Sequence, residues 1–411
     1  MQMIALREVV NLKTDSINPA LFPRNKWHLF SLPGYDEGKR REILLGCDIG
    51  STKYIVPNKC ILFNKLNVRF RRIWKIDDLT LNKICSTEFL PLVAKDGASL
   101  EFIYYALQSD TLTKHIAEVN TNTSGSHKRV DPNFILDSQI PFPDLPTQLR
   151  IAGVLGSIDE KIELNRKKIA ELEALAKTIY DYWFVQFDFP DKNGKPYKSS
   201  GGKMVWNDQL KREVPEGWEI CFLSDLCSIS TSQCNPSRLA QNEIEHYSIP
   251  AFDAGIFPSF EAPQSILSNK FYVPQQAILY SKLNAQFKRI WDPLHITDAP
   301  IASSEFVVYV PKNISYRGYV YAILNGEHFF KFANSISSCS TGSRKRFTPE
   351  TTCHFQVVLP PENILVSFSH EYSAILAAIR IARLEIDALR KRRDLLLPLL
   401  MNGQVEVRGE K

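Results

Sequence analysis

The segment from Lys53 to Lys75 has the residue types that suit contact with nucleic acid. It carries seven lysine and arginine residues and no aspartate or glutamate. Lysine and arginine neutralise phosphates, and asparagine, glutamine and arginine can form paired hydrogen bonds with base edges. The segment from Lys270 to Arg289 repeats the pattern with four basic residues and no acidic one. We therefore predict contact with a nucleic-acid duplex, with a solvated basic strand edge as the alternative.

Two short loops extend this prediction. GSHKR at residues 125–129 and GSRKR at residues 342–346 place glycine and serine, which let backbone amides approach a phosphate, next to basic side chains. The residues predicted to contact DNA are Lys53, Lys65, Asn67, Arg69, Arg71, Arg72, His127, Lys128 and Arg129 in the first half of the chain, and Lys282, Asn284, Gln286, Lys288, Arg289, Arg344, Lys345 and Arg346 in the second.

Motifs for catalysis are missing from the sequence. It contains no GxGxxG, GxxxxGK(S/T) or GxSxG pattern. DPNF at residues 131–134 only partly matches an amino-methyltransferase motif. Asp144 with Asp159 and Lys161 matches a nuclease spacing by letter alone, because the last two fall in a predicted helix. The eight cysteines form no CxxC pair and no zinc-type cluster. We expect reduced thiols and no metal, and the missing motifs disfavour an enzyme.

The residues predicted to contact DNA belong to a tandem repeat. VPNKCILFNKLNVRFRRIW at residues 56–74 returns 217 positions later as VPQQAILYSKLNAQFKRIW, with 11 of 19 positions identical. The same offset relates Asp36 to Asp253 without any gap. The chain is therefore two copies, about 1–194 and 218–411, which can be related by a pseudo-twofold axis.

Each copy is predicted to begin with an α/β body. About 140 residues mix short runs rich in Val, Ile, Phe and Tyr with proline and glycine. One helix is expected in each body, over residues 100–119 and 319–336. The letters shared by the two copies are predicted to hold the fold, among them Pro57, Ile61, Leu62, Leu66, Phe70 and Trp74.

A long helix follows a proline-rich stop in each copy. Its apolar residues recur at alternating four- and three-residue steps, which is the seam of a coiled coil. A twofold axis between the copies would make the two helices antiparallel, with one body at each end. Asn165, polar at a seam position, either fixes the register or is a tolerated half-exposed residue. The predicted seam residues are Ile151, Leu155, Ile158, Ile162, Asn165, Ile169, Leu172, Ala176 and Ile179 in the first helix, and Phe368, Tyr372, Ile375, Ile379, Ala382, Ile386, Leu389, Arg393 and Leu396 in the second.

The remaining segments set the domain boundaries and the cellular location. PDKNGKPYKSSGG between the copies contains Asn-Gly, Ser-Ser and Gly-Gly steps and is predicted to be a flexible connection. We find no run of about 18 apolar residues and no signal-type start, so we expect a cytoplasmic protein without membrane contact. The predicted domains are bodies at residues 1–145 and 215–361, helical regions at 146–186 and 362–405, and a linker at 187–214.

Over nearly its whole length the sequence resembles the specificity subunits of type I restriction-modification enzymes. The resemblance rests on IPFPDLPTQLRIAGVLGSIDEKIELNRKKIAELEALAKTIYDYWFVQFDF, DKNGKPYKSSGGKMVW, VPEGWEICFLSDL and the terminal LRKRRDLLLPLLMNGQVEV. It implies an α/β fold with two tandem, pseudo-twofold-related target-recognition domains, separated by two long helices packed as an antiparallel coiled coil. It also implies that each domain reads one half of a split, asymmetric DNA site, and that the helices set the unread spacer.

The same resemblance implies the partners and cofactors. Two methyltransferase subunits would dock on the helical regions, and restriction and motor subunits would join the full complex. S-adenosylmethionine, ATP and Mg are expected in those partners and not in this chain. One departure is that Met1 aligns with Trp218, so the first copy lacks a VPEGW opening and docking at this edge stays open. The alternatives are a related system in which the partner fuses methylation with cleavage, and a coiled-coil scaffold without a DNA role.

Overall fold

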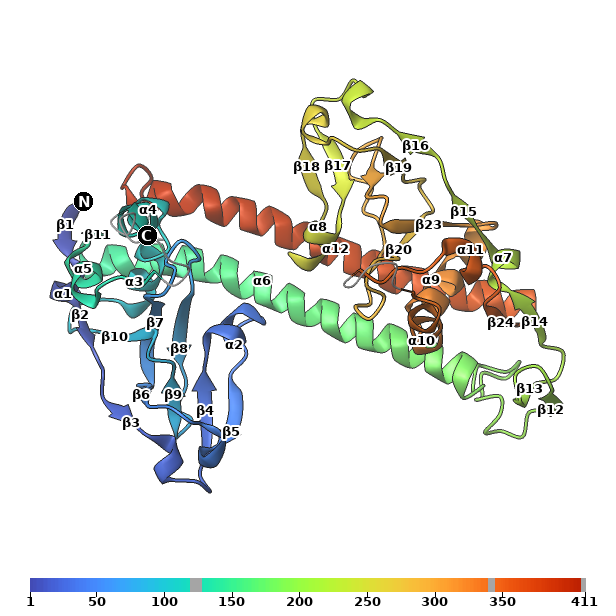
Figure 1. Ribbon diagram of the computed structural model, residues 1–411, viewed down its shortest axis with the longest axis horizontal. Helices are drawn as coiled ribbons and strands as arrows, with labels where there is room; N and C mark the ends of the chain where they lie inside the picture. Colours follow the sequence, from blue (N-terminus) through green and yellow to red (C-terminus); the bar gives the residue numbers. More distant parts are fainter. Residues whose placement is uncertain (119–127, 339–343, 408–411) are drawn as a thin grey trace. The chain divides into compact units, whose positions relative to one another are not determined.

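The computed structural model describes residues 1–118, 128–338 and 344–407 (Figure 1). The chain forms two compact units. Unit 1 is Met1–Ile162 with Ala388–Lys411, and unit 2 is Glu163–Asp387. Each of the two long helices, α6 (Leu145–Tyr180) and α12 (Glu362–Met401), is therefore divided between the units.

Unit 1 contains two main sheets. In the first, all neighbouring strands are antiparallel. In the second, the β4 and β9 pair is parallel and the other pairs are antiparallel. The first sheet has the order β2 (Val10–Leu12), β10 (Phe89–Ala94), β7 (Lys59–Asn64) and β8 (Ile73–Asp77), and the second has the order β3 (Ser16–Ile17), β6 (Lys53–Ile55), β9 (Lys83–Cys85), β4 (Lys26–Phe30) and β5 (Glu42–Leu45).

Alternation along β7 explains why its sheet is covered on both faces. Cys60 and Leu62 pack with Phe30 and Cys85 of the second sheet. Ile61 and the following Phe63 point the other way, into a core that α3 (Leu100–Ala106) and the first turns of α6 complete. Because successive strand residues face opposite sides, a strand covered on both faces is apolar at every position. The run ILF at residues 61–63 is of this kind.

Unit 2 repeats this architecture strand for strand, which confirms the predicted repeat and the α/β fold class. Its β17 and β22 pair is parallel, as β4 and β9 are in unit 1. The order is β15 (Cys227–Ser230), β23 (Phe306–Pro311), β20 (Ile278–Ser281) and β21 (Ile290–Trp291) in the first sheet, and β16 (Gln233–Cys234), β19 (Lys270–Tyr272), β22 (Ile301–Ala302), β17 (Ile244–Tyr247) and β18 (Ser259–Glu261) in the second.

The prediction of one continuous helix over residues 100–119, and of another over 319–336, is wrong, because each of these segments contains two helices. In unit 1 the break falls before α4 (Asp110–Glu118), where the hydroxyl of Ser109 accepts a hydrogen bond from the Leu112 amide at 3.3 Å. In unit 2, Gly326 separates α9 (Arg317–Asn325) from α10 (Glu327–Ser335) with extended backbone angles. Capping residues inside an apolar run end a helix that hydrophobic pattern alone would continue.

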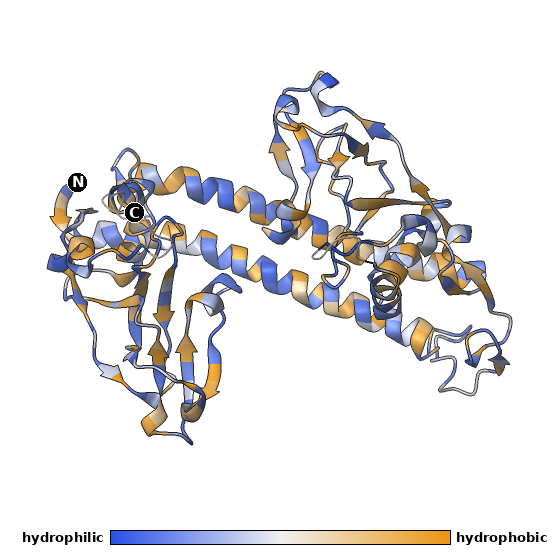
Figure 2. Ribbon diagram, viewed as in Figure 1, coloured by the Kyte–Doolittle hydropathy of each residue, from blue (hydrophilic) through white to orange (hydrophobic). Residues whose placement is uncertain are grey.

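Both long helices contribute to both cores, and hydrophobic residues recur along each of them (Figure 2). The start of α6 and the end of α12, including Leu400 and Met401, pack in the core of unit 1. The end of α6 packs with Phe368 in the core of unit 2. Inside unit 2 the helices are antiparallel, since Asn165 donates to Glu385 at 3.0 Å while the ring of Tyr180 lies 6.3 Å from that of Phe368.

Most of the predicted seam residues are buried. Leu155 and Phe368 are fully enclosed, and Asn165 is 6% exposed, with its amide held by Glu385. One position of the predicted seam is shifted, since Leu376 is buried where Ile375 is only half-buried. The reason is that this end of α12 also packs against the body of unit 2, which turns the buried face. The other half-buried members are Ile169, Leu172, Ile179, Arg393 and Leu396.

The predicted flexible connection is instead packed on unit 2. Phe189 stacks on Tyr197 with ring centroids 4.6 Å apart and lies 4.9 Å from Trp218. The carboxylate of Asp188 accepts hydrogen bonds from the amide and hydroxyl of Ser199 at 2.7 and 2.6 Å. The segment then forms a hairpin of β12 (Met204–Asn207) and β13 (Arg212–Pro215). The turn residues thus set the backbone path of the segment, while the aromatic residues pack it against unit 2.

Two short antiparallel pairs close the bodies where the copies begin. They are β1 (Gln2–Ala5) with β11 (Gln139–Phe142) in unit 1 and β14 (Glu219–Phe222) with β24 (Gln356–Leu359) in unit 2. Met1 lies beside Gly403, since a methyl group built on that glycine would be 3.6 Å from the Met1 Cγ atom. In the first copy, Met1 therefore lies at the end of α12. It stands at the position that Trp218 occupies in the second copy.

One described helix, α12, contains an 18-residue window that is apolar enough, by length and composition, to cross a membrane. This differs from the expectation that the sequence has no such run. A helix that packs in a protein core has the same composition, and α12 supplies core residues to both units.

Candidate nucleic-acid interface

The predicted DNA-contact segment of unit 1 forms a tight turn after β7. The side chain of Asn64, 2% exposed, bonds to the backbone of Leu66 in both directions, at 2.5 and 3.0 Å. Asn67 then adopts a left-handed conformation with φ of 50°, and its carbonyl accepts from the Phe70 amide at 2.9 Å. Asparagine tolerates this conformation better than most residues. The turn is therefore fixed by its own sequence.

This turn joins the second predicted loop. The Asn67 amide donates to the Lys128 carbonyl at 2.8 Å, and the Lys128 amide donates back to the Asn67 side chain at 3.3 Å. Val130 donates to the Lys65 carbonyl at 2.9 Å. Two sites that the sequence analysis treated separately are thus one, which we call basic turn 1 (residues 65–72 and 128–130).

Unit 2 builds the same structure, basic turn 2 (residues 282–289 and 344–347). Asn284 is left-handed with φ of 51°, and its amide donates to the Lys345 carbonyl at 2.7 Å. Its own carbonyl accepts from the Phe287 amide at 2.9 Å. Ser281 replaces the buried asparagine of unit 1, and its hydroxyl donates to the Leu283 carbonyl at 3.2 Å.

Four of the predicted DNA-contact arginines each hold a carboxylate of the protein through a fork of hydrogen bonds. Arg72 donates to both oxygens of Asp36, at 2.7 and 2.8 Å, and its pKa is raised mainly by this hydrogen bond. Arg129 forms a similar fork on Glu88, with a shortest distance of 2.7 Å. These pairs make the arginines positioning residues of the turns. They also reduce the positive field that the local sequence predicts.

The same two forks recur in basic turn 2. Arg289 donates to Asp253 at 2.7 and 2.9 Å. Arg346 donates to Glu305 at 2.9 and 2.7 Å, and this hydrogen bond holds the pKa of Glu305 below its ordinary value despite partial burial. The carboxylates repeat at the same offset of 217 as the arginines. That shared offset was the signal by which the pairs could have been found in the sequence.

Other predicted residues also lie in different settings from those expected. Arg71 pairs with Asp110 at 2.7 Å, and Lys288 donates to the Asn325 carbonyl at 3.0 Å. Lys53 lies on β6 in the other sheet, where its ammonium group bonds to Ser51, and burial lowers its pKa. His127 lies outside the described residues.

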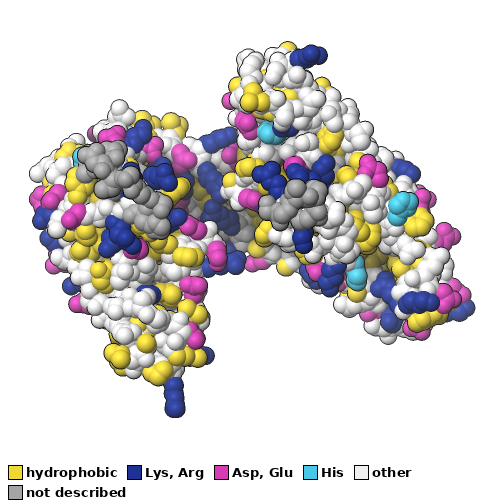
Figure 3. All heavy atoms as spheres, in the orientation of Figure 1, with side chains coloured by type: hydrophobic (Ala, Val, Ile, Leu, Met, Phe, Trp, Pro, Cys, Tyr) yellow, Lys and Arg dark blue, Asp and Glu magenta, His cyan; other side chains and the backbone are white. Residues whose placement is uncertain are grey.

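Six basic side chains of the turns remain available to an external anion. Within residues 1–118, 128–338 and 344–407 they form no ion pair, and lysine and arginine side chains are visible on the surface of both units in Figure 3. Unit 2 also exposes Gln286 where unit 1 has Arg69. The six are Lys65, Arg69 and Lys128 in basic turn 1, and Lys282, Arg344 and Lys345 in basic turn 2.

The prediction that the shared Phe70 belongs to the core is wrong. Its side chain is 51% exposed, and its counterpart Phe287 is 54% exposed. By contrast Ile61, Leu62 and Trp74 of the shared segment are buried as predicted. The left-handed asparagine turns the chain outward three residues before each phenylalanine, and hydrophobic pattern does not reveal that change of direction.

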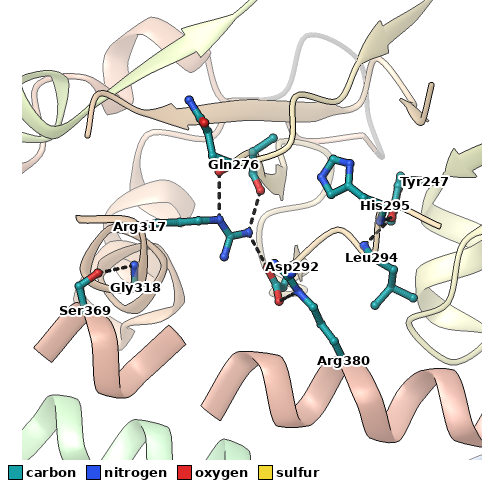
Figure 4. Close-up of polar contacts among 10 residues, drawn as sticks. Tyr247, Gln276, Asp292, Leu294, His295, Arg317, Gly318, Ser369 and Arg380 are labelled. Carbon is teal, nitrogen blue, oxygen red and sulfur yellow. Dashed lines mark hydrogen bonds and ion pairs between the residues drawn. The ribbon is translucent and has the colours of Figure 1, made fainter. Parts of the chain in front are cut away.

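The polar network in Figure 4 attaches the body of unit 2 to α12. Asp292, 3% exposed, pairs with Arg317 at 2.5 Å and with Arg380 of α12 at 2.5 Å. Gly318 comes so close to α12 that its amide donates to the Ser369 hydroxyl at 2.8 Å. The arrangement is structural, since Asp292, both arginines and Ser369 bond to other parts of the same unit.

Comparisons with known proteins agree with this organisation. A family model described as the type I restriction modification DNA specificity domain matches residues 49–174, which include basic turn 1 and most of α6. The specificity subunit of the type I restriction enzyme MjaIX from Methanocaldococcus jannaschii is 23% identical over 330 residues, covering 78% of this chain and 72% of the relative.

Two further matches extend over more of the chain. The HindI specificity subunit from Haemophilus influenzae is 21% identical over 413 residues, covering 87% of this chain and 88% of the relative. The crystal structure of a type I restriction-modification S subunit from M. genitalium covers 97% of this chain and 96% of its own, with a TM-score of 0.59 and 15% identity, which supports the fold. Over most of its length the chain is therefore similar to the specificity subunits of type I restriction-modification enzymes.

Proposed function

We propose that the two bodies read the two halves of a split, asymmetric double-stranded DNA site, one body for each half. The observation that carries this proposal is that one basic turn is built twice, around the same left-handed asparagine and the same arginine–carboxylate pairs, with different exposed residues. Arg69 in one turn stands where Gln286 stands in the other. Arginine and glutamine favour different base edges, so two such turns suit two different half-sites.

Methylation and cleavage belong to partner chains in this proposal. Two methyltransferase subunits dock on the helical regions, and restriction and motor subunits join the complete enzyme. S-adenosylmethionine, ATP and Mg act in those subunits, in the cytoplasm, while this chain supplies DNA specificity. A scaffold without a DNA role is the second candidate, but it gives no reason for six lysine and arginine side chains of the turns to stay unpaired within the described part of the chain.

The salt dependence of DNA binding tests the proposal. Lys65→Ala with Lys128→Ala removes two unpaired charges from basic turn 1 and leaves both arginine forks intact. In the complex with methyltransferase subunits, we expect weaker binding and a plot of log K against log salt that is shallower by about 2, since each lost phosphate contact removes roughly 0.9.

A matched control removes the same charge elsewhere. Lys192→Ala with Lys195→Ala changes two exposed lysines of the segment between the bodies and should leave the slope unchanged. Equal slopes for the wild-type complex and the basic-turn variant would contradict the assignment. A complex that shows no preference for any DNA sequence would contradict the function itself.

A further inference from the structure

Phe70 and Phe287 occupy the same place in the two basic turns, and both are exposed. Burying a phenylalanine side chain stabilises a protein, and isolated exposed apolar residues are common. Here, however, the exposure of 51% and 54% recurs in two copies that bury most of their other shared apolar residues, such as Leu62 and Trp74. The exposed position is therefore a property of the turn.

Each ring is held by a guanidinium group that is itself fixed. The guanidinium carbon of Arg72 lies 5.4 Å from the ring centroid of Phe70, and that of Arg289 lies 5.2 Å from that of Phe287. Both arginines are anchored by two hydrogen bonds to a carboxylate. A ring that packs on such a group loses little further freedom when it binds a ligand, which favours affinity.

The surroundings of the rings favour a ligand that is both anionic and aromatic. Lys65, Arg69 and Lys128 share the turn with Phe70, and within the described residues none of them forms an ion pair. A nucleic-acid duplex offers phosphates to such cations and flat base faces to the ring. Apolar side chains of DNA-binding proteins can insert between base steps and unstack them.

Resting on the proposed function, we propose that Phe70 and Phe287 act as wedges that stack on a base step, one in each half-site. The stacking positions each body on the duplex without reading a hydrogen-bond pattern. Phe70 has a second guanidinium, Arg69, 4.8 Å from its ring centroid, while the second turn has glutamine at that position. The ring of Phe70 is therefore held by a further guanidinium group that the second turn does not offer at that position.

Fluorescence of a base analogue tests the wedge in the assembled complex. The probe is a duplex carrying the recognised site, which mapping of methylated adenines in DNA from cells with the complete system would identify, with 2-aminopurine in one half-site or the other. We expect wild-type complex to raise the fluorescence in both halves, because unstacking relieves quenching. Phe70→Ala should abolish the rise in one half only and weaken binding roughly 5- to 150-fold. Phe70→Trp should preserve both signals.

Two further variants separate stacking from other roles. Phe70→Leu keeps an apolar group without an aromatic face, so it should behave like Phe70→Ala. Phe22→Ala removes another exposed phenylalanine of unit 1, 44% exposed, and should change neither signal.

Three results would overturn the inference. One is unchanged affinity and fluorescence in Phe70→Ala, and another is full activity of Phe70→Leu. The third is loss of methyltransferase subunits from Phe70→Ala on gel filtration, which would make the ring a protein contact. If wild-type complex binds no DNA, the proposed function fails as well. If the wild-type complex binds DNA and the phenylalanine variants bind it equally well, only the wedge is refuted and the proposed function stands.

Discussion

Replacing Asp292 by asparagine removes the negative charge that two arginines share in unit 2 (Figure 4). Arg317 donates to Asp292 at 2.5 Å, and Arg380 donates to its two oxygens at 2.5 and 2.7 Å. The side chain of Asp292 is 3% exposed and that of Arg317 is 8% exposed. The variant therefore leaves a buried positive charge without its counterion.

The expected cost follows from the burial of the partners. Removing one member of a buried ion pair typically costs about 3–5 kcal/mol. Arg380 is 31% exposed, so water replaces part of its lost interaction, and Arg317 still donates to the carbonyls of Gln276 and Ala277 at 3.1 Å. We therefore expect a loss near the lower limit, about 3 kcal/mol in the free energy of unfolding of unit 2.

The effect of pH has a definite sign. Burial raises the pKa of Asp292, but the hydrogen bonds and charges of Arg380 and Arg317 outweigh it and hold the pKa below its ordinary value. The ionised carboxylate therefore stabilises the folded state above the unfolded pKa of about 3.9, and this contribution is lost as pH falls through the folded pKa. The difference between wild type and Asp292→Asn should shrink in that acid range.

Hydrogen exchange in the full chain shows where stability is lost, and urea unfolding measures the total loss in the free energy of unfolding. Amides of α9 and the first half of α12 should exchange faster in Asp292→Asn, while those of β7 and β10 in unit 1 should not change. Asp298→Asn, an exposed aspartate six residues away, is the matched control. A loss below about 1 kcal/mol, or equal acceleration in both units, would refute the assigned role of the network.

Two other substitutions test the turn and the close helix contact. Asn67→Ala should cost about 1–2 kcal/mol and expose the Lys128 amide to exchange, because alanine disfavours the left-handed backbone, whereas Asn67→Gly should cost less. Equal costs would show that the backbone conformation is unimportant. Gly318→Ala should destabilise by about 1–3 kcal/mol in urea unfolding, although alanine favours helices, since its methyl group would lie 2.4 Å from the Ser369 carbonyl oxygen. A more stable variant would mean that the helices separate easily.

The fold could be predicted because the two copies within the chain can be compared with each other. A gapless offset of 217 residues shows which letters the two bodies share, and shared apolar letters such as Ile61 and Leu62 are buried in the structure. Local residues that interrupt the hydrophobic pattern, by capping a helix or by packing a loop, were missed. Ser109 and Gly326 end helices inside apolar runs, and Phe189 buries a segment whose turn residues indicated flexibility.

The residues of the candidate site could be predicted from the sequence, but the contacts that they make could not. Basic residues were found by local composition, but their partners lie far along the chain, with Asp36 for Arg72 and Glu88 for Arg129. A count of charge over 23 neighbouring residues cannot include a carboxylate that folding brings from another strand. The exposure of Phe70 likewise depends on the backbone angle of Asn67, which residue type alone does not fix.

The repeat also hides how differently the two bodies are attached to the helices. In unit 1, Tyr105 donates to Asp159 of α6 at 2.9 Å, and Arg393 of α12 pairs with the same carboxylate at 3.0 Å. The residues 217 positions away are the buried apolar Ala322, Leu376 and Ala176.

The network of unit 2 shows the converse. The counterparts of Asp292, Arg317 and Arg380 in the first copy are Lys75, Leu100 and Glu163, so the first copy does not have the residues of that network. A body moved onto the other copy's helix positions would leave Asp159 facing apolar side chains, or Arg380 without its carboxylate, and a buried unpaired charge is costly. The two bodies share a fold but match only their own helix segments, so an exchange of DNA specificity between relatives must keep each body's anchoring residues together with the helix residues they bind.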